Sequence, residues 1–127
     1  MRYAPGMPFD QSVLDLLDRT QEVEIETRTP GGATNRTILW IVADGGDVFV
    51  RSYRGPSARW YSEALADRLV VIHTGDRRLD ARVVPAGDPK SIARTSAALG
   101  RTYAGDPATP AMVRSDVLDT TLRLDPV

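Results

Sequence analysis

The chain has 127 residues, of which 42% are hydrophobic, and its formal net charge at pH 7 is −1. This length suits one domain over residues 1–127, and the near-neutral charge argues against a dedicated nucleic-acid binder. The lack of cysteine excludes disulfides, thiolate catalysis and cysteine metal sites. No apolar run is long enough to span a membrane, and the start lacks a signal-peptide core, so we expect a cytoplasmic protein with no membrane partner.

The first half of the chain predicts one helix followed by short strands and turns. Residues 1–8 hold two prolines and a glycine and predict an arm, and residues 9–18 predict a helix. Polar and apolar residues alternate strictly over 22–28, which predicts a strand with one wet face. Residues 36–43 are apolar on both faces, so they predict a central strand covered on both sides. A Gly-Gly turn then leads to a returning antiparallel strand over 47–53.

The second half predicts three strands and two helices. One helix runs from Ser57 or Ala58 to about Ala66, with Ser57 as its candidate N-cap, and the other covers 88–103; the strands cover 69–74, 77–85 and 119–125. Glycine and proline interrupt residues 104–118, where only a helical turn at 111–115 is predicted. The fold class is therefore mainly β with α. Six closely spaced strands predict an antiparallel barrel or strongly curled sheet, with about three helices at its ends and edges.

One stretch of the chain combines the features of an anion site. Arg51, Arg54 and Arg59 lie within nine residues that contain no acid, around the Gly55-Pro56 turn and the predicted helix start at Ser57. A helix N-terminus offers unpaired N–H groups, and guanidinium groups match phosphate oxygens. A solvated surface cluster is the alternative, but three like charges so close together favour an anionic partner. We therefore expect a phosphate-bearing ligand here.

The same residues resemble a known family. The segments 36–41 (RTILWI), 48–52 (VFVRS) and 57–59 (SAR) resemble the pyridoxamine-5′-phosphate-oxidase-like split barrels. The segments 52–55 (SYRG) and 60–66 (WYSEALA) look closer to the deazaflavin-dependent nitroreductase branch. The chain as a whole looks like the DUF2255-like bacterial proteins within this superfamily.

This resemblance implies a split barrel that binds a flavin-like cofactor at the interface of a homodimer. FMN and coenzyme F420 both remain open, because the loop from Ser52 to Ser57 is one residue longer than in the oxidases and Glu63 stands where the deazaflavin branch often has asparagine. Arginines and hydroxyls would hold the phosphate, and the strand from Arg36 would back the ring. The implied cofactor-binding residues are Arg36, Thr37, Ile38, Leu39, Arg51, Ser52, Arg54, Gly55, Ser57, Arg59 and Trp60.

Three functions are compatible with these residues. The first is an oxidoreductase that transfers hydride from FMN or F420 to a small organic acceptor, where the cofactor performs the bond-making. The others are a non-catalytic flavin- or haem-binding barrel and a cofactor-less interaction domain. No catalytic residue can be assigned, and no metal site is predicted, because His73 is the sole histidine in the sequence. Trp40, Trp60 and Tyr61 fit core positions as well as ligand contacts.

Overall fold

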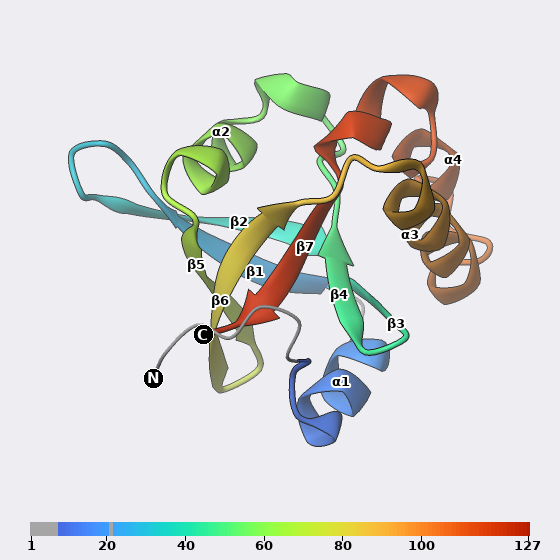
Figure 1. Ribbon diagram of the computed structural model, residues 1–127, viewed down its shortest axis with the longest axis horizontal. Coiled ribbons are helices and arrows are strands. Elements are labelled where there is room, and N and C mark those ends of the chain that lie inside the picture. The colour runs from blue at the N-terminus through green and yellow to red at the C-terminus, as the bar shows by residue number, and fades with distance from the viewer. Residues whose placement is uncertain (1–7, 21) are drawn as a thin grey trace.

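Seven strands form one antiparallel sheet in a computed structural model that describes residues 8–20 and 22–127 (Figure 1). The predicted arm at 1–8 therefore lies almost entirely outside the described residues. The elements in chain order are α1 (Gln11–Asp18), β1 (Glu22–Arg28), β2 (Thr34–Trp40), β3 (Val42–Asp44), β4 (Asp47–Val50), the 3₁₀ helix η1 (Gly55–Ser57), α2 (Arg59–Ala66), β5 (Leu69–Thr74), β6 (Arg77–Pro85), α3 (Pro89–Thr102), α4 (Thr109–Met112), the 3₁₀ helix η2 (Ser115–Thr120) and β7 (Leu122–Pro126).

The sheet curls strongly, and its two edge strands are joined end to end by the chain. Its strand order is β2-β1-β5-β6-β7-β4-β3, so the two edge strands, β2 and β3, are neighbours in the sequence. Only Ile41 separates them. One continuous stretch of chain thus pairs with β1 through its first half and with β4 through its second half, which closes the sheet into a barrel. The predicted class, mainly β with α in a curled antiparallel sheet, is confirmed.

The prediction of a central strand over 36–43 was wrong. This segment is divided into two edge strands, which raises the strand number from the predicted six to seven. Much of β2 is exposed, and Ile38 retains 62% of its accessible surface. The apolar run had suggested burial on both faces, but the second half of the run is what enters the core: Ile41 and Val42 are both 1% exposed.

A tyrosine hydroxyl satisfies the backbone at the point where this segment changes partners. The Tyr103 hydroxyl accepts a hydrogen bond from the Ile41 N–H at 3.3 Å and donates one to the Ile41 carbonyl at 3.1 Å. Ile41 belongs to neither strand, so these two groups need a partner from elsewhere. The hydroxyl of α3's C-cap residue supplies it from 62 positions away in the sequence.

We expect Tyr103→Phe to lower the free energy of unfolding by about 1–3 kcal/mol, because it leaves the buried Ile41 N–H and carbonyl without a partner. Urea unfolding followed by circular dichroism measures this change. Tyr53→Phe is the matched control, since Tyr53 is 52% exposed and should tolerate loss of its hydroxyl. Equal stability of the Tyr103 variant and the native protein would contradict this account of the strand switch.

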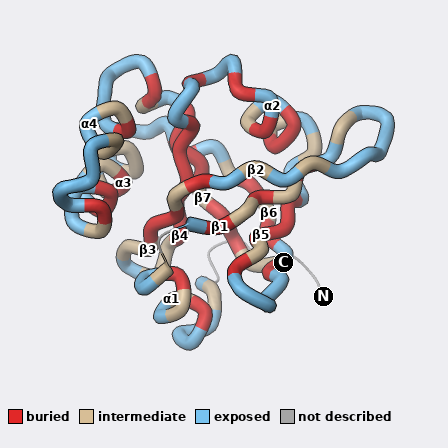
Figure 2. Tube along the Cα trace, turned by 180° about the vertical axis from the view of Figure 1, so that it is seen from behind, coloured by how far each residue is buried: buried red, intermediate tan, exposed pale blue. Residues whose placement is uncertain are grey.

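The core fills the barrel and continues under α3. Val23, Ile25, Val50 and Leu122 come from three strands of the barrel, β1, β4 and β7, and are at most 2% exposed. A second cluster, which includes Phe49, Leu99 and Tyr103, joins α3 to β3 and β4. Figure 2 shows buried residues concentrated on the strands, while the turn between β1 and β2 projects outward as an exposed loop.

The predicted hairpin β5–β6 has the same bounds in the structure. Helix α3 begins after Asp88, as predicted, and the Asp88 carboxylate accepts a hydrogen bond from the Ser91 N–H at 3.0 Å. Two other bounds differ. The last strand, β7, begins at Leu122 instead of residue 119, because Ser115–Thr120 form a 3₁₀ helix. Strand β4 ends at Val50 instead of Tyr53, because the Ser52 N–H donates to the Thr120 hydroxyl rather than to a strand.

Across residues 8–20 and 22–127, no helix is long and apolar enough to cross a membrane.

Candidate functional site

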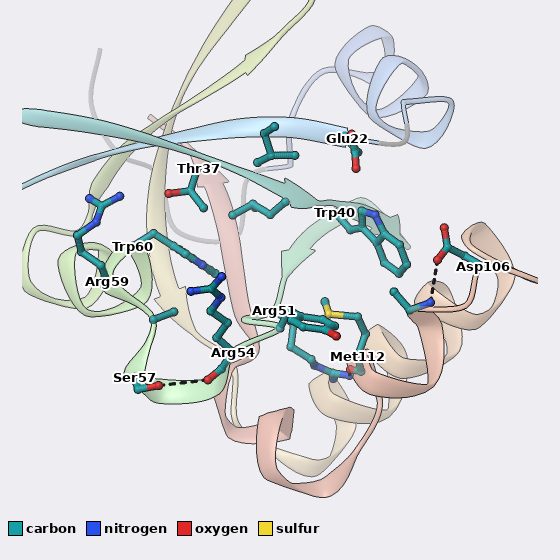
Figure 3. A pocket seen from close by; sticks show the side chains of 15 residues that line it. Glu22, Thr37, Trp40, Arg51, Arg54, Ser57, Arg59, Trp60, Asp106 and Met112 are labelled. Atoms are coloured by element: carbon teal, nitrogen blue, oxygen red, sulfur yellow. Dashed lines mark hydrogen bonds between the residues drawn. The ribbon is translucent and has the colours of Figure 1, made fainter.

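A cavity of about 930 Å³ lies beside β2 (Figure 3). Its walls come from four separate parts of the chain: the start of β1, β2, the segment from the end of β4 to the first turn of α2, and the segment from Asp106 to the end of α4. The predicted anion stretch thus forms one wall. A segment for which the sequence predicted little, 104–118, supplies another.

The cavity runs along the free edge of β2. Four consecutive residues, Thr37 to Trp40, line it. Side chains of a strand point alternately to opposite faces, so a space that meets all four must lie at the strand's edge. Because β2 is a terminal strand of the sheet, this edge carries backbone N–H and C=O groups with no strand partner among residues 8–20 and 22–127. The structure therefore brings Thr37, Ile38 and Leu39 to the cavity, with an open backbone for a planar ligand.

Arg51 is buried at the base of this wall, with 1% of its surface exposed. Its Nε donates to the Thr121 hydroxyl at 2.9 Å, Nη1 to the Ser96 hydroxyl and the Met112 carbonyl at 3.0 Å each, and Nη2 to the Ile92 carbonyl at 3.1 Å. Four of its five N–H donors are thus used by the protein. All four acceptors are neutral, and burial lowers the pKa of the guanidinium to about 10. A buried positive charge without a bonded carboxylate is unusual and raises the electrostatic potential of the cavity.

The other two arginines of the stretch are exposed and face the cavity from the same side (Figure 3). Arg59 lies in the first turn of α2, where its Nη1 contacts Glu63 Oε1 at 2.9 Å. Within residues 8–20 and 22–127, the Arg54 guanidinium has no carboxylate partner. Arg54 is therefore the cation most available to an anionic ligand, because the Arg59 charge is offset by the Glu63 carboxylate.

The remaining residues of the predicted anion stretch divide between cavity wall and turn. Ser57 and Trp60 line the cavity, but Ser52 and Gly55 do not. The Ser52 hydroxyl is fully buried and donates to the Gly55 carbonyl at 2.7 Å. Gly55 has φ +76°, a conformation that side chains rarely adopt, so glycine serves the turn here.

The prediction of Ser57 as a helix N-cap was wrong. Residues Gly55–Ser57 form a 3₁₀ turn, and the N-cap of α2 is Ala58, which has no capping side chain. The Ser57 hydroxyl instead donates to the Arg54 carbonyl at 3.3 Å. The first N–H groups of α2 thus lack a side-chain cap beside the arginines, as a site for an anion requires.

Sequence reasoning missed one side of the cavity. Asp106, Ala108 and Met112 line it, and Trp40 stacks on Tyr103 with ring centroids 3.9 Å apart. No local motif marks these residues. A bias toward glycine and proline over 104–110 predicted only a loop, and the position of that loop depends on Arg51, whose hydrogen bond to the Met112 carbonyl spans 61 positions.

Arg36 lies apart from the other predicted ligand residues. It occupies the outer side of β2, within 3.7 Å of Glu24 and of Glu26, and borders a separate pocket of about 400 Å³. His73 faces the same pocket and contacts Glu26 Oε1 at 2.8 Å. This hydrogen bond from His73 holds the pKa of Glu26 below its usual 4.5. The positive charge of Arg36 is therefore compensated by the carboxylates of Glu24 and Glu26.

Residues 13–124 match the family described as uncharacterised protein conserved in bacteria, DUF2255. The chain belongs to the DUF2255 family. The resemblance inferred from the sequence is thereby confirmed. No curated protein matches this DUF2255 chain.

Solved structures share the fold at low sequence identity. The conserved hypothetical protein Rv2991 from Mycobacterium tuberculosis has a TM-score of 0.69 at 13% identity, over 98% of this chain and 82% of that one. The heme storage protein HutZ from Vibrio cholerae has 0.70 at 16%, over 95% and 92%. An F420-H2 dependent reductase, FDR-A, has 0.61 at 15%, over 82% and 93%. Identities this low establish that the DUF2255 protein shares their split-barrel fold, and no more.

Proposed function

We propose that this DUF2255 protein binds FMN or F420 in the cavity beside β2 and acts as an oxidoreductase that delivers a hydride to a small organic acceptor. The observation that carries the proposal is the charge of the cavity's arginine wall. In the described part of the chain, Arg51 is buried without a bonded carboxylate, and Arg54 beside the same cavity has no carboxylate partner. A buried positive charge of this kind is stabilised by an anion, and phosphate fits guanidinium geometry.

The cavity suits the ring of such a cofactor as well as its phosphate. The open edge of β2 offers N–H and C=O groups of the kind that hydrogen-bond to a flat heterocycle, and Leu39, Trp60 and Met112 provide apolar contact. When bound, the cofactor supplies the hydride chemistry. The chain's residues bind it, orient its ring along β2 and keep water from one face.

The shared fold of the F420-H2 dependent reductase and of HutZ supports a cofactor site without choosing the cofactor. The cavity's chemistry favours the flavin type over haem. His73 is the single histidine of the sequence, and it lies outside this cavity in contact with Glu26. A non-catalytic carrier of the same cofactor is the alternative function.

Two further parts of the proposal concern assembly and location. We propose a homodimer, because Ile38 places a 62% exposed apolar side chain at the rim of the cavity, where a second copy would cover it. One structure of the same fold is described as a domain-swapped dimer. We also propose a cytoplasmic location, with no nucleic acid as partner.

Titration of the ligand-free protein with FMN and with F420, followed by cofactor fluorescence, tests the proposal. We expect one of the two to bind with Kd on the order of 1 μM or tighter, or about −8 kcal/mol. The protein loaded with that cofactor in its reduced form should then pass electrons to menadione faster than the free cofactor does. Binding without such acceleration would favour the carrier, and no binding of either cofactor would contradict the proposal.

A further inference from the structure

The side of the cavity away from the arginines is negatively charged. In Figure 3, Arg54 and Arg59 lie on one side, and Glu22 and Asp106 lie on the other. Both carboxylates are exposed, and neither has a cationic partner within residues 8–20 and 22–127. One oxygen of Asp106 accepts the Ala108 N–H at 2.8 Å, which fixes the carboxylate and leaves its other oxygen available. The cavity is therefore charged oppositely at its two ends.

An aromatic platform lies between these two carboxylates. The Trp40 indole lines the cavity and stacks on Tyr103 at an interplanar angle of 4°. Tyr103 is 4% exposed and does not line the cavity, so it covers one face of the indole and leaves the other to a ligand. The stack is a rigid surface, because the Tyr103 hydroxyl is tied to Ile41.

Both acidic residues are neighbours of this stack. Glu22 is the cross-strand partner of Trp40, so their side chains lie side by side on one face of the sheet. The Asp106 N–H donates to the Tyr103 carbonyl at 3.1 Å. Burial, with the Glu22 charge in addition, raises the pKa of the Tyr103 phenol to about 12. The negative field of Glu22 thus reaches the aromatic pair.

We propose that the Trp40 end of the cavity binds a planar organic cation, such as a protonated or N-alkylated nitrogen heterocycle, stacked on the indole and flanked by Glu22 and Asp106. The face of an indole attracts cations through its quadrupole, and two unpaired carboxylates add to that attraction. A neutral ring receives only the stacking, and an anionic ring is repelled.

The cavity has room for this ligand beside a cofactor. Its volume of about 930 Å³ lies near the top of the usual range for ligand pockets, about 300–1,000 Å³. If the cavity holds a reduced cofactor at its arginine end, the cation is the acceptor. That part of the inference rests on the proposed function, whereas the binding of the cation does not.

Isothermal titration of the full chain with N-methylquinolinium tests the inference, with neutral quinoline as the ligand of similar shape. We expect the cation to bind more tightly than quinoline. The double variant Glu22→Gln, Asp106→Asn should weaken binding of the cation about tenfold and leave quinoline unchanged. The double variant Asp18→Asn, Asp76→Asn removes the same charge from exposed sites elsewhere and should retain full affinity for the cation.

Trp40→Leu should weaken both the cation and quinoline, because it removes the stacking surface. Equal affinity for the cation and for quinoline, or the same loss in both carboxylate variants, would overturn the inference. Titrating FMN and F420 into the same proteins separates the two proposals. If the cation binds and neither cofactor does, the proposed oxidoreductase function is rejected and the cation site is retained. If a cofactor binds and the cation does not, only the cation site is rejected.

Discussion

Arg51→Met is expected to lower the free energy of unfolding by about 2–4 kcal/mol. The guanidinium joins the end of β4 to α3, α4 and the start of β7 through four hydrogen bonds. Methionine fills much of the same volume but donates none of them. The carbonyls of Ile92 and Met112 then remain without that donor. Removing a buried charge offsets part of this cost, which is why the expected loss is smaller than the sum of four bonds.

Urea unfolding followed by circular dichroism measures this loss. Arg54→Ala is the matched control: it also removes a guanidinium from the same stretch, but Arg54 is exposed and its guanidinium has no carboxylate partner in the described part of the chain, so stability should not change. Arg51→Lys keeps the charge without the planar fork and should fall between the two. If Arg51→Met were as stable as the control, the guanidinium would not be the link between the cavity's walls.

The second large effect is expected on ligand affinity. Arg54→Ala should weaken binding of the phosphorylated cofactor by roughly 10–150-fold, because a hydrogen bond to a charged group contributes about 1.5–3 kcal/mol. Fluorescence titration with FMN or F420, whichever the native protein binds, measures the change. The effect belongs to the phosphate, so riboflavin or the phosphate-free deazaflavin should bind the variant as well as the native protein.

Arg19→Ala is the charge control, since Arg19 is exposed at the end of α1, away from the cavity. It should leave affinity for the phosphorylated cofactor unchanged. Equal losses for FMN and riboflavin in Arg54→Ala would mean that Arg54 contacts the ring or shapes the cavity, and would remove the phosphate assignment. Since Arg54→Ala is also the stability control for Arg51, one protein serves both measurements.

Local signals were sufficient wherever a segment's pattern is decided by its own residues. The alternation over 22–28 and the paired apolar strands 69–74 and 77–85 have the predicted bounds, because a strand with one buried face repeats every second residue. Asp88 followed by proline gave the correct helix start for the same reason: a cap acts on N–H groups two or three residues away. The three clustered arginines all line one cavity.

Tertiary contacts decided which strand is an edge and what each arginine does. The apolar run at 36–43 reads as buried, yet half of it forms an exposed edge, because its partners β1 and β4 lie at opposite ends of one curled sheet. Arg51, Arg54 and Arg59 are alike in sequence. Arg51 is buried because acceptors 41 to 70 positions away close around it, whereas the Arg54 guanidinium meets none in the described part of the chain. The sequence therefore determined the composition of the cavity's charged wall, and long-range packing determined which of its charges remains for a ligand.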